Sequence, residues 1–294
     1  MSHVLERPDK IAFVDTGRPP SRAAMAVGSY LSAQADGILD GVAGLRCGED
    51  QVHDTRVALR RLRSTMRVFR RLLDDGAGDL DEDLKWFSAL LGSLRDCQVQ
   101  RHRLQQAVDE LPDELVLGPV GARIASDLRR DESFARTRVA EAMDSPRYQD
   151  LIAELQSWRG QPSVCVDGSR GQLMKKAQRA GEKADRRLAA ALAGGDDASL
   201  HRARKAAKRA RYAHELIKQV SHTRDVKATI KRYRKIQRVC GDHQDTVITV
   251  GWLRHAGAVA GTTPGENGFT FGLLCAREQS IGRRSRRRAG KLRP

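Results

Sequence analysis

The side chains with the clearest chemistry are the arginines of residues 53–71, a stretch that holds seven arginines and one acid. On a helix of about 100° per residue, one arc of the surface holds His53, Arg56, Arg60, Arg63, Arg67, Arg70 and Arg71. Another arc holds the large apolar residues Leu59, Leu62, Met66, Phe69 and Leu73. Each guanidinium can pair with two phosphate oxygens, and the spacing sets the guanidiniums along a line of about 27 Å. The stretch therefore predicts a helix that packs on one face and binds an extended anion on the other.

The same pattern returns after residue 200. At an offset of 148 residues, His53, Arg56, Arg60, Arg61 and Arg63 correspond without a gap to His201, Arg204, Lys208, Arg209 and Arg211. At an offset one residue longer, Lys85, Gly92, Asp96 and Val99 correspond to Arg234, Gly241, Asp245 and Ile248. Basic solvated helix faces are common and resemble one another, but two ordered motifs at nearly constant offset predict two copies of one helical unit.

The elements that position these side chains are all expected to be helices. Hydrophobic residues make up 40% of the chain and aromatic residues only 4%, and the apolar set is rich in Ala, Leu and Val, which favours close-packed helices over a sheet. We predict an extended arm over residues 1–20, a first helical repeat over 21–158, a linker over 159–171, a second repeat over 172–282 and a basic tail over 283–294. Four helices in each repeat could close as an antiparallel bundle.

Composition narrows the classes of function. The 294 residues carry a formal net charge of +16, and such a field attracts polyanions. No apolar run reaches the roughly 18 residues of a membrane helix, and the first residues lack the order of a signal peptide, so we expect a cytoplasmic protein. The five cysteines are far apart and form no Cys-x-x-Cys pair, which disfavours a disulfide framework or a thiolate zinc site.

These motifs together resemble the CHAD family, the conserved histidine α-helical domain. In the first repeat the resemblance rests on Val52-His53-x-x-Arg56-Val57-x-x-Arg60-Arg61-Leu62-Arg63, Leu91-Gly92-x-x-Arg95-Asp96 and Asp144-Ser145-Pro146-Arg147-Tyr148. In the second it rests on Leu200-His201-x-x-Arg204-Lys205-x-x-Lys208-Arg209-x-Arg211-Tyr212-x-x-Glu215 and Gln237-x-x-x-Gly241-x-x-x-Asp245. The resemblance covers about residues 21–285, and it departs at Cys240, where the family usually has leucine.

The resemblance implies an all-α fold of two tandem four-helix-bundle-like repeats related by pseudo-twofold symmetry. It also implies binding of inorganic polyphosphate on a basic surface, often in polyphosphate granules. The residues predicted to bind polyphosphate are His53, Arg56, Arg60, Arg63, Arg67, Lys85, His201, Arg204, Lys205, Lys208, Arg211 and Arg234. Arg61 lies off the stripe and is a weaker candidate, and Arg209 matches it.

The acids and histidines of the motifs have less certain roles. Asp96 and Asp245 are expected to orient the arginines through supporting ion pairs, because an acid among arginines more often pairs than ligates a metal. His53 and His201 begin the basic helices, where an imidazole can donate to a phosphate or instead bond backbone or a nearby aspartate. The residue pattern weighs these two roles equally.

Other polyanions and other chemistries remain as alternatives. A nucleic-acid binder is the second hypothesis, although aromatic residues for base stacking are few. A metal-dependent phosphohydrolase is less favoured, because the chain has no Glu-x-Glu-x-Lys stretch, no Gly-x-x-x-x-Gly-Lys loop and no His-x-x-x-His pair. We therefore expect no catalytic residue, no metal, no cofactor and no membrane partner, while a homo-oligomer stays open.

Overall fold

The computed structural model describes residues 21–73, 77–159 and 169–293. The first half contains α1 (Arg22–Arg46), α2 (Val52–Phe69), η1 (Arg70–Leu72), α3 (Ala77–Asp109), η2 (Asp113–Leu115), α4 (Val120–Met143) and α5 (Pro146–Ser157). The second half contains α6 (Arg170–Leu192), α7 (Asp197–Val220), α8 (Arg224–Ala260) and α9 (Phe269–Gly290). These ranges contain no strand, so the predicted all-α class is confirmed.

Several helices begin where the sequence supplies a side chain that caps the free backbone amides. The side chain of Ser145 accepts from the amide of Tyr148, and Pro146 occupies the first turn of α5. Ser169 caps α6 in a reciprocal arrangement with Gln172. The predicted arm over 1–20 and most of the predicted linker over 159–171 lie outside the described residues.

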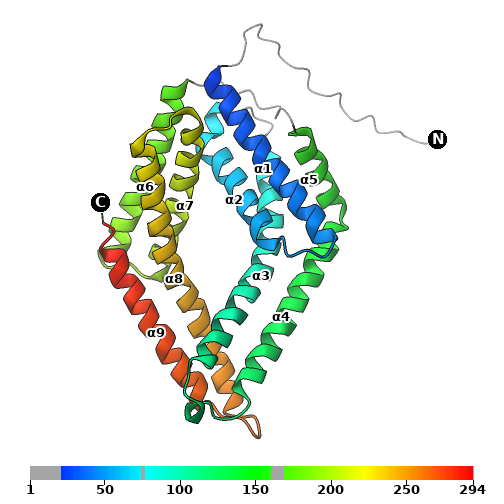
Figure 1. Cartoon of the computed structure of the whole chain (residues 1–294), viewed down its shortest axis with the longest axis vertical. Coiled ribbons are helices and arrows are strands. Elements are labelled where there is room, and N and C mark those ends of the chain that lie inside the picture. Colours follow the sequence, from blue (N-terminus) through cyan, green and yellow to red (C-terminus); the bar gives the residue numbers. More distant parts are fainter. Residues whose placement is uncertain (1–20, 74–76, 160–168, 294) are drawn as a thin grey trace, which may run out of the picture.

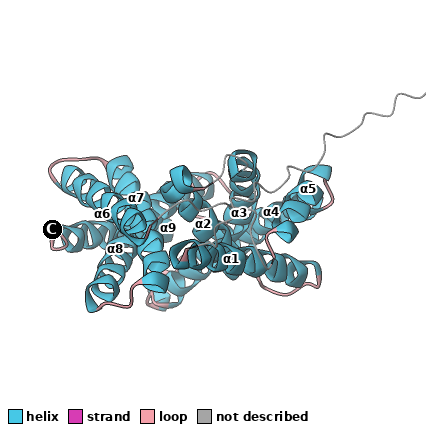
Figure 2. Ribbon diagram, turned by 90° about the horizontal axis from the view of Figure 1, so that it is seen from above, coloured by secondary structure: helices cyan, strands magenta, loops and turns pink. Residues whose placement is uncertain are grey.

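Two hairpins of long helices extend from a shared centre. Figure 1 shows α2 and α7 near each other in the upper part of the molecule, while α3–α4 and α8–α9 run downward and meet again at the lower end. Figure 2 gives the same arrangement from above, with α6 to α9 on one side and α1 to α5 on the other. The long helices α3 and α8 therefore connect the centre of the molecule to its far end.

Three hydrophobic clusters hold this arrangement, and two of them join the halves. The largest contains Leu31, Leu62 and Phe87 of the first half together with Leu173 and Leu216 of the second. A second cluster, at the far end, packs side chains of α3 and α4 against side chains of α8 and α9: Leu104, Ile124, Leu128, Leu253, Phe271 and Leu274. The third lies among α6, α7 and α8. The two predicted repeats thus share apolar cores, and their tandem relation stays a prediction.

The segment predicted as a basic tail, residues 283–294, is largely helical. Helix α9 continues to Gly290, beyond residue 282, where the second repeat is predicted to end. Ser285 and Ala289 are buried along this last part, and Arg286 donates to the carbonyl oxygen of Gly195. The arginine density of the segment suggested a solvated end, but its small residues allow the helix to pack closely on the turn between α6 and α7.

Candidate anion-binding site

The packing of α2 against α7 brings the two basic stripes together. Arg56 and Arg60 of α2 meet Arg204 and Lys208 of α7, and we call these four residues the central cluster. The strongest charges acting on Lys208 are those of Arg60, Arg204 and Arg56, in that order. The central cluster thus forms one positively charged region where α2 packs against α7, two helices that lie near each other in the upper part of Figure 1.

Acidic partners are scarce in the central cluster. Arg56 Nη1 donates to Asp96 Oδ1 at 2.9 Å and to the carbonyl oxygen of Gly92 at 3.2 Å. Among the described residues, Arg60, Arg204 and Lys208 form no ion pair with an acid. The Nε atoms of Arg56, Arg60 and Arg204 are buried, and none of them has a hydrogen-bond partner among the described residues. Several positive charges held together without acidic partners favour the binding of an anion, whose oxygens would supply the missing hydrogen-bond acceptors.

Burial and neighbouring cations weaken proton binding in the cluster. Burial, followed by the charges of Arg60 and Arg204, lowers the pKa of Lys208 to about 7. Burial also lowers the pKa of Arg60, with further lowering by Arg56 and Arg204, while Tyr212 opposes the shift. Both pKa values fall because burial and the neighbouring cations disfavour the positively charged form.

Two glycines allow the arginines to lie against the next helix. A Cβ atom added at Gly92 would lie 3.3 Å from Nη2 of Arg56, and one added at Gly241 would lie 3.2 Å from Nε of Arg204. The contact is the same in both halves: an arginine of α2 or α7 rests on a glycine of α3 or α8. The glycines that correspond in the two repeats, Gly92 and Gly241, thus leave room for the side chains of Arg56 and Arg204.

The two aspartates predicted to support the arginines differ. Asp96 pairs with Arg56, as expected, and its side chain is largely exposed. Asp245 forms no ion pair with a described residue. Burial raises the pKa of Asp245, although the charges of Arg204 and Arg103 lower it. Asp245 therefore acts on Arg204 through its charge rather than through a direct pair.

A partly buried acid, Glu215, joins α2 to α7. Glu215 lies 3.2 Å from Nε of Arg61 and 3.3 Å from Nε of Arg211. Arg211 also stacks over the ring of Tyr212, with its Cζ atom 4.4 Å from the ring centroid. Arg61 points away from the stripe, as its angle predicts. Arg211, predicted to contact phosphate, is held by this acid and lies in a supporting position.

A further group of cations lies at one end of the cluster. Arg63 and Arg67 both bind Asp81 of α3, with distances of 3.0 and 2.8 Å. Burial lowers the pKa of Arg209, and the nearby charges of Arg67 and Arg187 lower it further. Arg209, a weaker candidate from the sequence, is therefore joined by Arg187, which the sequence did not indicate. The spacing of residues along α7 gives the position of Arg209 around the helix axis. It does not reveal that α6 and α2 lie beside this residue.

The remaining predicted contacts lie at the periphery. Lys85 is exposed and pairs with Glu82 of its own helix at 2.8 Å. Lys205 and Arg234 are also exposed, and neither Lys85 nor Arg234 is a principal charged neighbour of Arg60 or Lys208. The structure therefore brings four of the predicted residues into the central cluster and leaves these three outside it.

The two histidines occupy unlike environments. His53 is exposed at the start of α2, whereas His201 is partly buried. Burial lowers the pKa of His201, and the charges of Lys205 and Arg204 lower it further, while Gln244 opposes the shift. The Nδ1 atom of His201 is buried and has no hydrogen-bond partner among the described residues. His201 is thus the better placed of the two to donate to an anion as a neutral imidazole.

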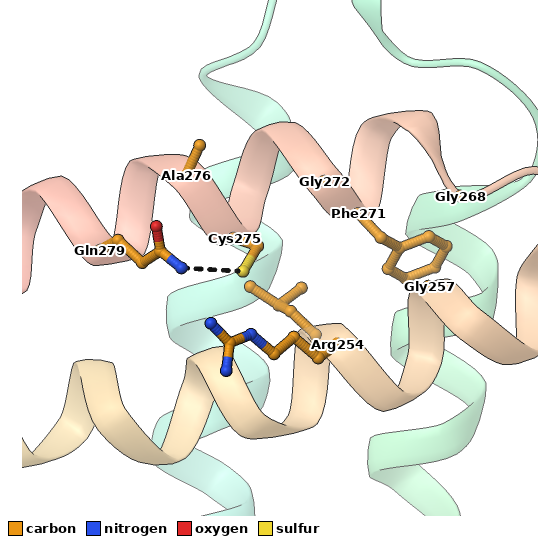
Figure 3. A pocket seen from close by; sticks show the side chains of 9 residues that line it. Arg254, Gly257, Gly268, Phe271, Gly272, Cys275, Ala276 and Gln279 are labelled. Atoms are coloured by element: carbon orange, nitrogen blue, oxygen red, sulfur yellow. Dashed lines mark hydrogen bonds between the residues drawn. The ribbon is translucent and has the colours of Figure 1, made fainter.

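Two pockets elsewhere in the molecule are lined by other kinds of residues than the central cluster. Figure 3 shows one between α8 and α9, lined by glycines with Phe271, Cys275 and Arg254. Another is lined by charged residues of α3, α8 and α9, including Arg103, Asp242 and Glu278. Within the described residues, no group of three or more His, Cys, Asp or Glu side chains is arranged to hold a metal ion. No described helix has the length and apolar character needed to cross a membrane.

The fold and the site define an all-α protein with a cationic centre built from two histidine- and arginine-rich helices. The CHAD domain model matches residues 29–254, and the chain belongs to the CHAD family. It is 32% identical over 252 residues to two uncharacterized proteins of Mycobacterium tuberculosis, MT2285 of strain CDC 1551 / Oshkosh and Rv2226 of strain ATCC 25618 / H37Rv. These alignments cover 81% of this chain but only 46% of each relative, so the chain spans about half the length of the curated relatives it matches.

Two solved structures share the fold. PptA from Streptomyces chartreusis matches with a TM-score of 0.77 and 21% identity, over 91% of this chain and 98% of that one. The CHAD domain from the plant Ricinus communis matches with a TM-score of 0.70 and 22% identity, over 97% of both chains. The family and the CHAD fold expected from the motifs are therefore confirmed.

Proposed function

We propose that the protein binds inorganic polyphosphate at the central cluster, without catalysis, and accompanies it in polyphosphate granules. One observation carries the proposal: Arg60, Arg204 and Lys208 converge from two helices and form no ion pair with an acid of the described chain. A linear polyphosphate presents repeated, equivalent phosphate oxygens, and closely spaced guanidiniums can pair with them. Membership in the CHAD family supports the same ligand class.

The environment of the cluster favours polyphosphate over a nucleic acid. Single-stranded nucleic acids usually bind through a basic groove together with exposed aromatic rings on which bases stack. Tyr212, the aromatic residue beside Arg60, is fully buried and offers no such face. A ligand that consists of phosphate alone needs no stacking surface.

Binding is expected to weaken steeply as salt increases, because each paired cation releases a counterion from the polymer. For the four cations of the central cluster, we expect a plot of log K against log salt to have a slope of about −3 or steeper. The measurement is a titration with long-chain polyphosphate at several salt concentrations. Single-stranded RNA of equal total charge serves as the competitor.

Three results would overturn the proposal. Binding that does not change with salt would contradict a site of paired charges. RNA that displaces polyphosphate at equal charge would favour the nucleic-acid alternative. Release of phosphate in the presence of magnesium or manganese would contradict a non-catalytic role.

Gly241→Ala is expected to weaken polyphosphate binding several-fold without lowering stability. The added methyl group would meet Nε of Arg204 at 3.2 Å and displace the guanidinium, whereas alanine is favoured over glycine within a helix. Gly251→Ala, in the same helix, is the matched control because its methyl group would meet nothing within 4 Å. Equal affinities of the two variants would show that the contact between Gly241 and Arg204 does not affect polyphosphate binding.

A further inference from the structure

Lys208 differs from the other members of the central cluster in its chemistry. A lysine ammonium can release its proton when it is buried, whereas an arginine guanidinium keeps its charge. Lys208 is partly buried on α7, which packs against α2, and the charges acting on it come from Arg60 and Arg56 of α2 and from Arg204 and Arg209 of its own helix. The cluster therefore contains one cation that can become neutral among several that cannot.

The groups around Lys208 on the other elements do not supply a direct counterion. From α3, Asp96 is engaged by Arg56, and from α8, Asp245 acts on Arg204. From α6, Arg187 acts on Arg209 and adds positive charge. No acid of the described chain forms an ion pair with Lys208. In the free protein, the charges nearest to Lys208 thus favour the neutral amine.

A bound phosphate chain would reverse this balance. Its oxygens would pair with Arg60 and Arg204 and place negative charge beside the amine, and an opposite charge at such a distance favours the ammonium form. We propose that binding of polyphosphate at the central cluster is coupled to the uptake of one proton by Lys208, which makes the site sensitive to pH. The inference rests on the proposed function, because it requires a polyanion at the cluster.

The direction of the pH effect follows from the two states of Lys208. Burial and the neighbouring arginines lower the pKa of Lys208 to about 7 in the free protein, and a bound polyanion raises it again. Between these two pKa values the complex holds one more proton than the free protein, so affinity falls by about tenfold for each unit of rising pH. Below about pH 7 Lys208 is protonated in both states, and its contribution to the pH dependence disappears.

His201 is the other titratable group near the cluster that the test must separate. Burial and the charges of Lys205 and Arg204 lower its pKa from 6.5. A bound polyanion would raise the pKa of His201 as it raises that of Lys208, so pH alone does not separate the two groups. Comparison of the wild type with Lys208→Arg, which keeps His201, isolates the contribution of Lys208.

The test is isothermal titration calorimetry of the full chain with long-chain polyphosphate in buffers of different ionisation enthalpy. The dependence of the observed enthalpy on the buffer gives the number of protons taken up. At pH 8 we expect about one proton per bound site, and the affinity should fall about tenfold between pH 8 and pH 9. The matched variant is Lys208→Arg, which keeps the charge but cannot release the proton. This variant should still bind, take up about one proton fewer than the wild type at pH 8, and lose the tenfold fall in affinity between pH 8 and pH 9.

The outcomes distinguish the inference from the proposed function. Binding of the wild type without proton uptake at pH 8 would overturn the inference and leave the proposed function intact. Equal uptake by the wild type and by Lys208→Arg would also overturn it, because another group would then be responsible. Absence of polyphosphate binding at every pH would instead reject the proposed function.

Discussion

The double substitution Arg60→Ala with Arg204→Ala is expected to weaken binding of long-chain polyphosphate by roughly 10²- to 10⁴-fold. A hydrogen bond to a charged group contributes about 1.5–3 kcal/mol, and the variant removes two guanidiniums that would each pair with phosphate. These two arginines come from different helices and have no acidic partner in the described chain, so their loss leaves no buried acid unpaired. Calorimetric titration at low salt measures the change.

The control for this variant removes the same charge elsewhere. Arg129 and Arg138 are exposed on the outer helix α4, which packs against α3 and α5. Arg129→Ala with Arg138→Ala should reduce the affinity only slightly, through the lower net charge. If both double variants lost the same affinity, the net charge of the protein rather than the central cluster would account for binding.

Glu278→Ala is expected to lower the free energy of unfolding by about 3–5 kcal/mol, because it leaves a partly buried arginine without its partner. The side chain of Glu278 on α9 is only 2% exposed. Its two carboxylate oxygens accept from Nε and Nη2 of Arg103 on α3, at 3.0 and 2.6 Å. Urea-induced unfolding, followed by circular dichroism, gives the free-energy difference.

The matched control breaks an ion pair at the surface. Asp40 pairs with Arg159 at 3.0 Å, and the two side chains are 73% and 54% exposed. Asp40→Ala should therefore change the free energy of unfolding by about 1 kcal/mol or less. A loss at Glu278 no larger than the loss at Asp40 would contradict a structural role for the buried pair.

The helical fold and the residues at the centre of the site could be predicted from the sequence. The heptad-like spacing of Leu59, Leu62 and Met66 predicts the buried face of α2, and all three are buried. The equal spacing of Arg56 and Arg60 with Arg204 and Lys208 predicts two related stripes. That the two stripes meet is shown by the packing of α2 against α7.

What the sequence could not supply was the set of neighbours from other helices. Glu215 of α7 pairs with Arg61 of α2, 154 positions away, as well as with Arg211 one turn before it on its own helix. The pair of Arg103 with Glu278 joins residues 175 positions apart, so no local pattern marks it. The packing of α9 up to Gly290 likewise depends on its contact with the turn between α6 and α7. Each contact between different helices joins residues far apart in the sequence, where no local spacing marks it.

The two separate contacts between the halves have a mechanical consequence. The halves meet at α2 and α7, and they meet again where Arg103 binds Glu278 and Thr270 donates to the carbonyl oxygen of Leu115. The long helices α3 and α8 link these two joints, so the chain forms a closed frame with stiff sides (Figure 1). In such a frame neither joint can open widely unless a helix bends or the other joint also yields. The far joint, distant from any proposed ligand, thus restrains the angle at which the two basic helices cross.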